Sequence, residues 1–146
     1  MRLEGKTAVI TGGGTGIGQG IAQAYAGEGC KVVIAGRREE PLKIAAEAWN
    51  GAGEMLYQTM DVACRDSVKG FFDWVTANVG QIDILVNSAG TNIPNRTIAS
   101  MEPEQWDQVM AINASGAYYT MYEALPQMRE RGDGIVINIS SISGIR

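Results

Sequence analysis

The stretch Thr11-Gly-Gly-Gly-Thr-Gly-Ile-Gly18 decides the fold, because it lies between a short apolar run and a helical pattern. A G-x-x-x-G-x-G spacing fits at residues 12, 16 and 18, and also at residues 14, 18 and 20. The first spacing is favoured because Gly12 follows the apolar run directly. Glycines in such a turn let the backbone approach a pyrophosphate and leave the first helical N–H groups aimed at the anion. This position predicts a dinucleotide-binding turn rather than a flexible turn that binds nothing.

Outside this turn, short β-branched runs alternate with segments whose apolar residues recur at helical spacing. The runs predict strands at 7–10, 32–35, 55–60, 82–86 and 135–139. A helix is expected after each of the first four strands, the last one spanning 103–128 with Pro126 kinking or ending it. Continuous apolar strands are typical of a parallel sheet with helices on both faces. We therefore expect one dinucleotide-binding domain over residues 1–146, with the α/β doubly wound parallel sheet of the Rossmann type.

Composition excludes several classes of function. The chain carries 12 Lys and Arg against 16 Asp and Glu, a net charge of −4. This balance argues against binding nucleic acid or an anionic membrane, because both need a basic surface. Histidine is absent, which excludes Ser-His-Asp and Cys-His nucleophile systems and metal sites that need imidazole. No metal site is expected, and any general acid or base must be Tyr, Lys, Asp, Glu or Cys.

The cysteines and the N-terminus bear on location. Cys30 and Cys64 form no C-x-x-C motif, and such sparse use is typical of reduced cytosolic thiols. The N-terminal residues 1–6 lack the apolar segment of a signal peptide. No apolar run reaches the roughly 18 residues of a membrane span. We therefore expect a soluble, cytoplasmic protein.

Five motifs, in order along the chain, resemble the short-chain dehydrogenase/reductase family. The glycine turn resembles the family's nucleotide-binding turn, and Asp61-Val62 resembles its adenine-contacting pair. Asn87-Ser-Ala-Gly90 resembles the N-N-A-G motif, with Ser88 in place of the second Asn. Asn113 resembles the active-site Asn of the long fourth helix, and Gly134–Ser141 resembles the fifth strand that ends at the catalytic Ser.

The resemblance implies a strand order of 3-2-1-4-5 and a set of cofactor-binding residues. Asn87 is expected to tie the central strands together more than to act in catalysis. The implied cofactor-binding residues are Gly12, Thr15, Gly16, Ile17, Gly18, Arg37, Arg38, Asp61, Val62, Asn87, Ala89 and Gly90.

The end of the second predicted strand indicates which nicotinamide cofactor is bound. An acid at this point accepts hydrogen bonds from the ribose 2′-OH, whereas an Arg accommodates a 2′-phosphate. The strand ends in Gly36-Arg37-Arg38 with no Asp or Glu, which favours NADP(H) over NAD(H). The alternative is that both arginines are solvated and pair with Glu39 and Glu40. The glycine turn, which has Thr at position 15, also lacks the extra basic residue that many NADP(H)-dependent members carry there.

The resemblance further implies hydride transfer between nicotinamide C4 and a carbonyl or alcohol carbon. In this family a Tyr transfers the oxygen-bound proton, and a nearby Lys favours the phenolate. Ser141 is the candidate for the Ser that polarises the carbonyl, with Ser140 as the alternative if the register differs by one. Either hydroxyl could instead cap local backbone.

Asn113 is the second candidate catalytic residue, and the resemblance implies that it helps hold a water-linked proton path. It falls within an apolar stripe of the predicted helix, so its amide is expected to point into the core and to need partners. A structural Asn that holds a helix kink is an equal alternative. The stripe comprises Trp106, Val109, Met110, Ala117, Met121, Ala124 and Leu125.

The Tyr-x-x-x-Lys pair of the family is absent from these 146 residues. The fifth strand would also form an apolar sheet edge, which is a template for aggregation unless something covers it. We therefore expect the sequence to be a fragment of a longer reductase; a naturally truncated protein would need a partner to cover that edge.

The leading hypothesis is an NADP(H)-dependent oxidoreductase that acts on a small carbonyl or alcohol substrate and forms a homo-oligomer at full length. The first alternative is a non-catalytic NAD(P)-binding module or pseudoenzyme. The second is another Rossmann-type binder such as a methyltransferase, which Arg37-Arg38 disfavours because a ribose-binding acid is expected there.

Overall fold

The short apolar runs form the strands of one parallel sheet in the computed structural model, which describes residues 1–94 and 96–142. Within these residues the sheet has five strands in the order β3-β2-β1-β4-β5, and every neighbouring pair is parallel. This confirms the doubly wound α/β fold of the Rossmann type and its expected strand order. The strands are β1 Thr7–Thr11, β2 Lys31–Gly36, β3 Met55–Thr59, β4 Ile84–Asn87 and β5 Ile135–Asn138.

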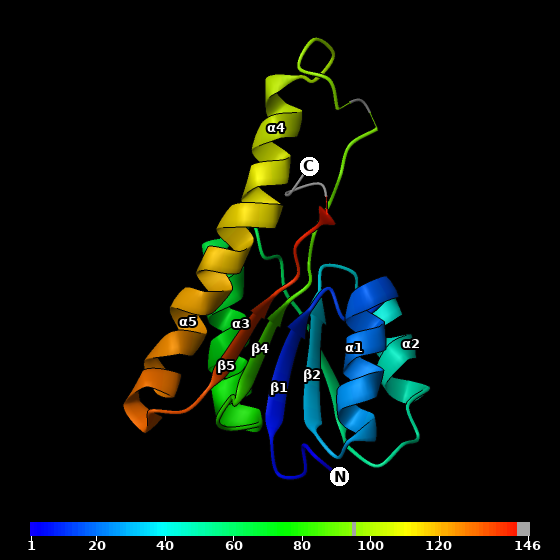
Figure 1. Cartoon of the computed structure of the whole chain (residues 1–146), viewed down its shortest axis with the longest axis vertical. Helices are drawn as coiled ribbons and strands as arrows, with labels where there is room; N and C mark the ends of the chain where they lie inside the picture. The colour runs from blue at the N-terminus through cyan, green and yellow to red at the C-terminus, as the bar shows by residue number, and fades with distance from the viewer. Residues whose placement is uncertain (95, 143–146) are drawn as a thin grey trace.

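Helices cover both faces of the sheet (Figure 1). α1 (Gly16–Gly27) and α2 (Glu39–Glu47) pack on one face, and α3 (Arg65–Asn78) and the long helix after β4 pack on the other. In β1, Ala8 and Ile10 contact the first layer and Val9 contacts the second. Both sides of each central strand are buried, so these strands are continuous apolar runs. None of the helices in the described part of the chain is long and apolar enough to cross a membrane.

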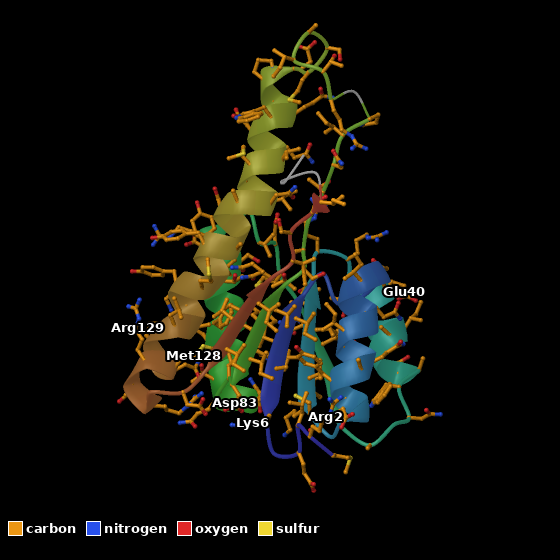
Figure 2. All side chains as sticks on the ribbon, viewed as in Figure 1. Arg2, Lys6, Glu40, Asp83, Met128 and Arg129 are labelled. Atoms are coloured by element: carbon orange, nitrogen blue, oxygen red, sulfur yellow. The ribbon has the colours of Figure 1, made fainter. Side chains whose placement is uncertain are left out.

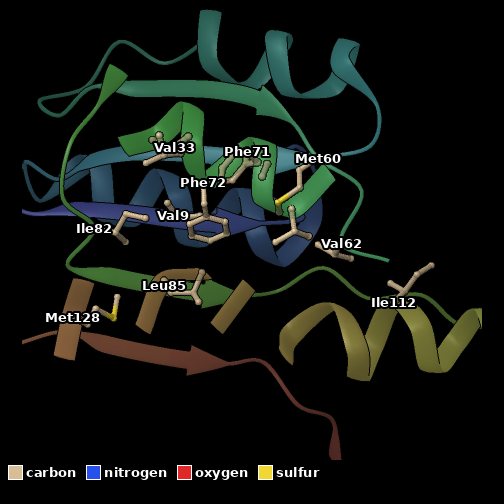
Figure 3. Close-up of a cluster of buried hydrophobic side chains, with 14 residues drawn as sticks. Val9, Val33, Met60, Val62, Phe71, Phe72, Ile82, Leu85, Ile112 and Met128 are labelled. Carbon is tan, nitrogen blue, oxygen red and sulfur yellow. The ribbon is translucent and has the colours of Figure 1, made fainter. Parts of the chain in front are cut away.

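One buried cluster lies between the sheet, α3 and the long helix (Figure 3). Phe71 and Phe72 of α3 meet edge to face, with ring centroids 5.3 Å apart. Leu85 of β4 packs in the same cluster, which continues to Val62 and Ile112 near the carboxyl ends of the strands. The core therefore holds the loop after β3 and the beginning of the long helix in fixed positions beside that end of the sheet.

The long helix predicted over 103–128 is interrupted and also longer than expected. α4 (Pro103–Met110) leads into a π turn over Ala111–Ser115, and α5 (Gly116–Arg131) follows. Of the two effects expected of Pro126, a kink or the end of the helix, the second is wrong, because α5 continues to Arg131. A proline removes one backbone hydrogen bond, and the buried residues Ala124 and Met128 on either side hold this part of α5 against the core.

The apolar stripe predicted for this helix is wrong up to the π turn but correct further along, where Ala124 is buried and Met121 and Leu125 pack against the core. Asn113 is exposed and Trp106 is 52% exposed. A π turn closes i→i+5 hydrogen bonds instead of i→i+4, so the apolar face of the residues before it is not continuous with the face after it. The buried positions instead recur every four residues from the π turn onward: Ile112, Gly116, Thr120, Ala124 and Met128.

The strand predicted at 82–86 begins two residues later than expected. Ile82 is fully buried, but its backbone groups are bound by side chains of α5. Its N–H donates to Gln127 Oε1 at 2.9 Å, and its carbonyl accepts from Arg131 Nη2 at 2.8 Å. These bonds replace the sheet pairing of Ile82, and β4 starts at Ile84.

Candidate functional site

A cleft of about 400 Å³ opens at the carboxyl ends of the strands. β1 pairs with both β2 and β4, so the strand order reverses at β1, and open α/β sheets bind ligands at such a point. The cleft brings together ten of the twelve predicted cofactor-binding residues: Gly12, Thr15, Gly16, Ile17, Gly18, Arg37, Arg38, Val62, Ala89 and Gly90.

Close backbone contacts shape the glycine turn. Gly12 has a φ of 68°, and a Cβ there would lie 3.0 Å from the backbone N and Cα of Ala89. A Cβ on Gly18 would overlap the carbonyl group of Gly12. Gly16, with a φ of 57°, has open space around it, as does Gly20. The geometry therefore supports the spacing that starts at Gly12, since Gly20 meets no contact that requires a glycine.

The N-terminus of α1 forms one wall of the cleft. Its N-cap residue, Thr15, makes no side-chain cap hydrogen bond, and the first N–H groups of a helix have no partner within the helix. The first turn, Gly16–Gly18, lines the cleft. These N–H groups are therefore available to an anion in the cleft.

Two exposed arginines follow β2 on the same side of the cleft. Arg37 and Arg38 both line it. Within residues 1–94 and 96–142, neither forms an ion pair with Glu39, Glu40 or any other acid. In this part of the chain the two arginines therefore do not pair with the adjacent glutamates, as the alternative had it. Both guanidinium groups remain available to a ligand.

The last residue of β1 holds the segment that follows β4 in place. Thr11 Oγ1 accepts hydrogen bonds from the N–H groups of Ser88 at 3.1 Å and Ala89 at 3.0 Å. This pair of bonds holds Ala89 and Gly90 at the cleft, where both were expected.

Asn87 does not line the cleft but a smaller cavity of about 60 Å³ beside it. It is buried, and its Oδ1 accepts from the Thr120 hydroxyl at 2.6 Å. Its Nδ2 donates to Asn138 Oδ1 at 2.8 Å. The Asn87 side chain thus joins β4 to α5 and β5, as expected of a residue that ties the central strands together.

Of the two candidate catalytic residues, one is found at this smaller cavity. Asn113 lines it and binds the backbone of Thr91: its Oδ1 accepts from the Thr91 N–H and its Nδ2 donates to the Thr91 carbonyl, both at 2.8 Å. Ser141 is exposed and lies beyond the end of β5. Ile139, two residues before it, lines both cavities. The amide of Asn113 therefore finds its partners in a loop and not in the core.

Asp61 is the other predicted residue outside the cleft lining. Its Oδ1 accepts from the Ala63 N–H at 3.0 Å, and its own N–H donates to Ser67 Oγ at 3.0 Å. These bonds shape the loop between β3 and α3, in which the next residue, Val62, lines the cleft.

Several lining residues were not predicted from the sequence. Gly36 and Met60 are marked by their place at the ends of β2 and β3, a signal that could have been used. Thr91 belongs to the irregular segment that begins at Gly90, whereas Ile112 carries no such signal, because the π turn brings it to the site. The unpredicted lining residues are Gly14, Gly36, Pro41, Leu42, Met60, Ser88, Thr91, Ile112 and Ile139.

The cleft combines three kinds of groups that suit one elongated ligand. Helical N–H groups and a close backbone approach suit a pyrophosphate. The guanidinium groups of Arg37 and Arg38 suit a second phosphate. Apolar side chains such as Leu42 and Val62 suit a flat ring. The fold and this cleft together define a Rossmann-type protein whose cleft lies at the point where the strand order reverses, the usual place of a ligand in such sheets.

The sequence matches the family model described as short chain dehydrogenase over residues 6–146. An uncharacterized oxidoreductase of Staphylococcus aureus is 38% identical over 142 residues, which cover 97% of this chain and 61% of that relative. The chain thus spans about three fifths of that relative's length.

Two solved structures are also similar. A metagenomic short-chain oxidoreductase in complex with NADP has a TM-score of 0.92 and 32% identity, covering 100% of this chain and 66% of that one. L-Sorbose reductase from Gluconobacter frateurii, complexed with NADPH and L-sorbose, has a TM-score of 0.92 and 35% identity, covering 99% of this chain and 56% of that one. The chain belongs to the short-chain dehydrogenase/reductase family, whose members are oxidoreductases.

Proposed function

We propose that residues 1–146 form the dinucleotide-binding domain of an NADP(H)-dependent oxidoreductase. The reaction transfers a hydride between the nicotinamide and the carbonyl or alcohol carbon of a small substrate. One observation carries the choice of cofactor: Arg37 and Arg38 line the cleft without acidic partners, and no carboxylate ends β2. The similar structures that contain NADP or NADPH support the same choice.

The cleft fits a dinucleotide with a 2′-phosphate. The glycine turn and the N-terminus of α1 would hold the pyrophosphate, because the turn has no side chains that block close approach. Arg37, supported by Arg38, would hold the 2′-phosphate through charged hydrogen bonds. Val62, Ala89 and Gly90 line the remaining length of the cleft.

The cofactor supplies or accepts the hydride when it is bound. The side chains of this chain bind and orient the reactants. Ser141 donates a hydrogen bond to the substrate oxygen, with Ser140 as the alternative donor. Asn113 holds the loop at Thr91 against the cleft through its two hydrogen bonds.

The 146 residues contain no Tyr-x-x-x-Lys pair for the proton step. We therefore propose that the acid and base lie in a part of the protein outside these residues, and that these residues by themselves bind the cofactor without turnover. A non-catalytic NAD(P)-binding module is the competing proposal. It predicts that the natural protein, at whatever length it occurs, binds NADPH and reduces no carbonyl compound.

The charge of Arg37 provides the direct test of the cofactor proposal. Arg37→Asp replaces a phosphate-binding charge with a repelling one, so NADPH affinity should fall by about tenfold or more relative to NADH. Binding of both cofactors is measured by calorimetry. Lys43→Asp is the matched control, because it makes the same charge change on the exposed surface of α2. An unchanged NADPH to NADH ratio in Arg37→Asp would defeat the phosphate assignment.

We also propose that the protein is a cytoplasmic homo-oligomer. Exposed large side chains follow one another along α4 and α5, and such a stripe is typical of a surface covered in an assembly. They are Trp106, Met110, Tyr118 and Tyr122. The free thiols of Cys30 and Cys64 suit a reducing compartment.

A further inference from the structure

The π turn and the first residue of α5 contact two different segments of the cofactor cleft. Gly116 packs on Val62, which follows β3 and lines the cleft. Asn113 binds the backbone of Thr91, which follows β4 and lines the cleft as well. Ile112, in the same π turn as Asn113, lines both the cleft and the smaller cavity. One short piece of helix therefore sets the separation of two loops that come from different strands.

The contact at Gly116 leaves no room for a side chain. A Cβ on Gly116 would lie 2.9 Å from both the Cβ and the Cγ2 of Val62, and 3.2 Å from the Val62 carbonyl oxygen. Val62 is 6% exposed, and rotation of its side chain cannot relieve the contact, because the Cβ is attached directly to the backbone. A methyl group at position 116 must therefore push α5 and the Val62 loop apart. Asn113 precedes Gly116 by less than one helical turn. A shift of Gly116 therefore also shifts Asn113 and its hydrogen bonds to Thr91.

We propose that Gly116 is a positioning residue for the cofactor site. The close contact that it permits holds Val62 and, through Asn113, Thr91 at the separation that the ligand needs. This inference rests on the proposed function only in naming NADP(H) as the ligand. The link from Gly116 to Thr91 stands on the contacts alone.

Gly116→Ala tests this role, with Gly70→Ala as its matched control. Both replace a glycine of an α-helix with a better helix former, but a Cβ on Gly70 meets nothing within 4 Å. Two quantities are measured: the Kd for NADPH, and the exchange rate of the Thr91 amide without cofactor. Gly116→Ala should raise both by about tenfold or more, because overpacking a filled contact costs enough free energy for that change. Gly70→Ala should change neither.

Val62→Gly provides a second background in which the added methyl group has more room, because it removes both the Cβ and the Cγ2 that lie 2.9 Å away. If the contact acts as proposed, Gly116→Ala costs much less NADPH affinity in Val62→Gly than in the parent. If Gly116→Ala does not fold, folding should return in the double variant. Equal losses in both backgrounds, or a folded Gly116→Ala with unchanged Kd and Thr91 exchange, would overturn the proposal. If the parent binds no nicotinamide cofactor, the proposed function fails, while faster Thr91 exchange confined to Gly116→Ala still supports the positioning role.

Discussion

At the scale of single residues, the two thiols of the chain differ in what surrounds them. Cys30 is fully buried, and its Sγ donates a hydrogen bond to the Lys6 carbonyl at 3.2 Å. Burial, followed by the negative charge of Asp83, raises the pKa of the Cys30 thiol from its ordinary value of 9.0 to about 11. Cys64 is exposed at the N-cap of α3. Only the thiolate reacts readily, so the reactivity of the native protein is confined to Cys64.

This difference predicts an alkaline loss of stability. The folded state keeps the Cys30 proton up to about pH 11, whereas the unfolded chain releases it near pH 9. The stabilising contribution is therefore complete below pH 9 and is lost as the pH rises toward 11. Urea unfolding across this range should show a decline in the parent that is smaller in Cys30→Ala. Iodoacetamide should modify Cys64 but not Cys30 in the native state, and rapid labelling of a folded Cys64→Ser variant would contradict the assignment.

At the scale of elements, a chain of side-chain bonds that begins in the core joins α5, β4 and β5. The Thr120 hydroxyl donates to Asn87, Asn87 donates to Asn138, and the Asn138 amide lies 3.9 Å from the sulfur of Met121, back on α5. Thr120 is fully buried. Polar groups in such a position are costly if left unpaired, so this chain fixes how α5 lies against the two strands beneath the smaller cavity.

Thr120→Val should therefore destabilise the protein although it preserves the shape of the side chain. The change leaves Asn87 Oδ1 without its donor in a buried site, at a cost of about 1–3 kcal/mol in the free energy of unfolding. Thr76→Val is the matched control, since the Thr76 hydroxyl bonds the Phe72 carbonyl on the exposed side of α3. Its effect should stay within about 0.5 kcal/mol. Equal effects of the two changes in urea unfolding would show that the Asn87 bond contributes little.

The long helix also marks the limit of prediction from sequence. The glycine turn and the Arg37-Arg38 pair could be predicted because each is a local pattern next to a strand. The strand order followed from the family resemblance. No local pattern marks the π turn, and the packing of Gly116 on Val62 directly after it joins two residues far apart in the chain. Asn113 lies in that turn and lines the smaller cavity, but its exposed position and its bonds to Thr91 could not be predicted from the apolar stripe.

At the scale of the whole molecule, a cluster of charged side chains lies at the end of the sheet opposite the cleft. Lys6 and Asp83 lie together where β1 and β4 begin (Figure 2). Asp83 Oδ2 accepts from the Thr7 N–H at 2.9 Å, and its Oδ1 lies 3.5 Å from Arg131 Nη2 and 3.7 Å from Lys6 Nζ. Lys6 also pairs with Asp133 at 3.5 Å. The cluster therefore joins the beginning of the chain to the segment between α5 and β5.

Asp83→Ala should lower the free energy of unfolding by about 2–3 kcal/mol, because it leaves the Thr7 N–H and the Arg131 guanidinium short of acceptors. The side chains of Asp83 and Arg131 are only 20% and 19% exposed, and within the described residues Arg131 Nη1 already has no partner. Asp73→Ala is the control: its pair with Lys69 is shorter, at 2.6 Å, but the two side chains are 64% and 62% exposed. Water screens that pair, so its loss should cost clearly less stability than the loss of Asp83. If urea unfolding gave the opposite ranking, distance rather than burial would set the strength of these ion pairs, and the cluster would not hold the two ends of the chain together.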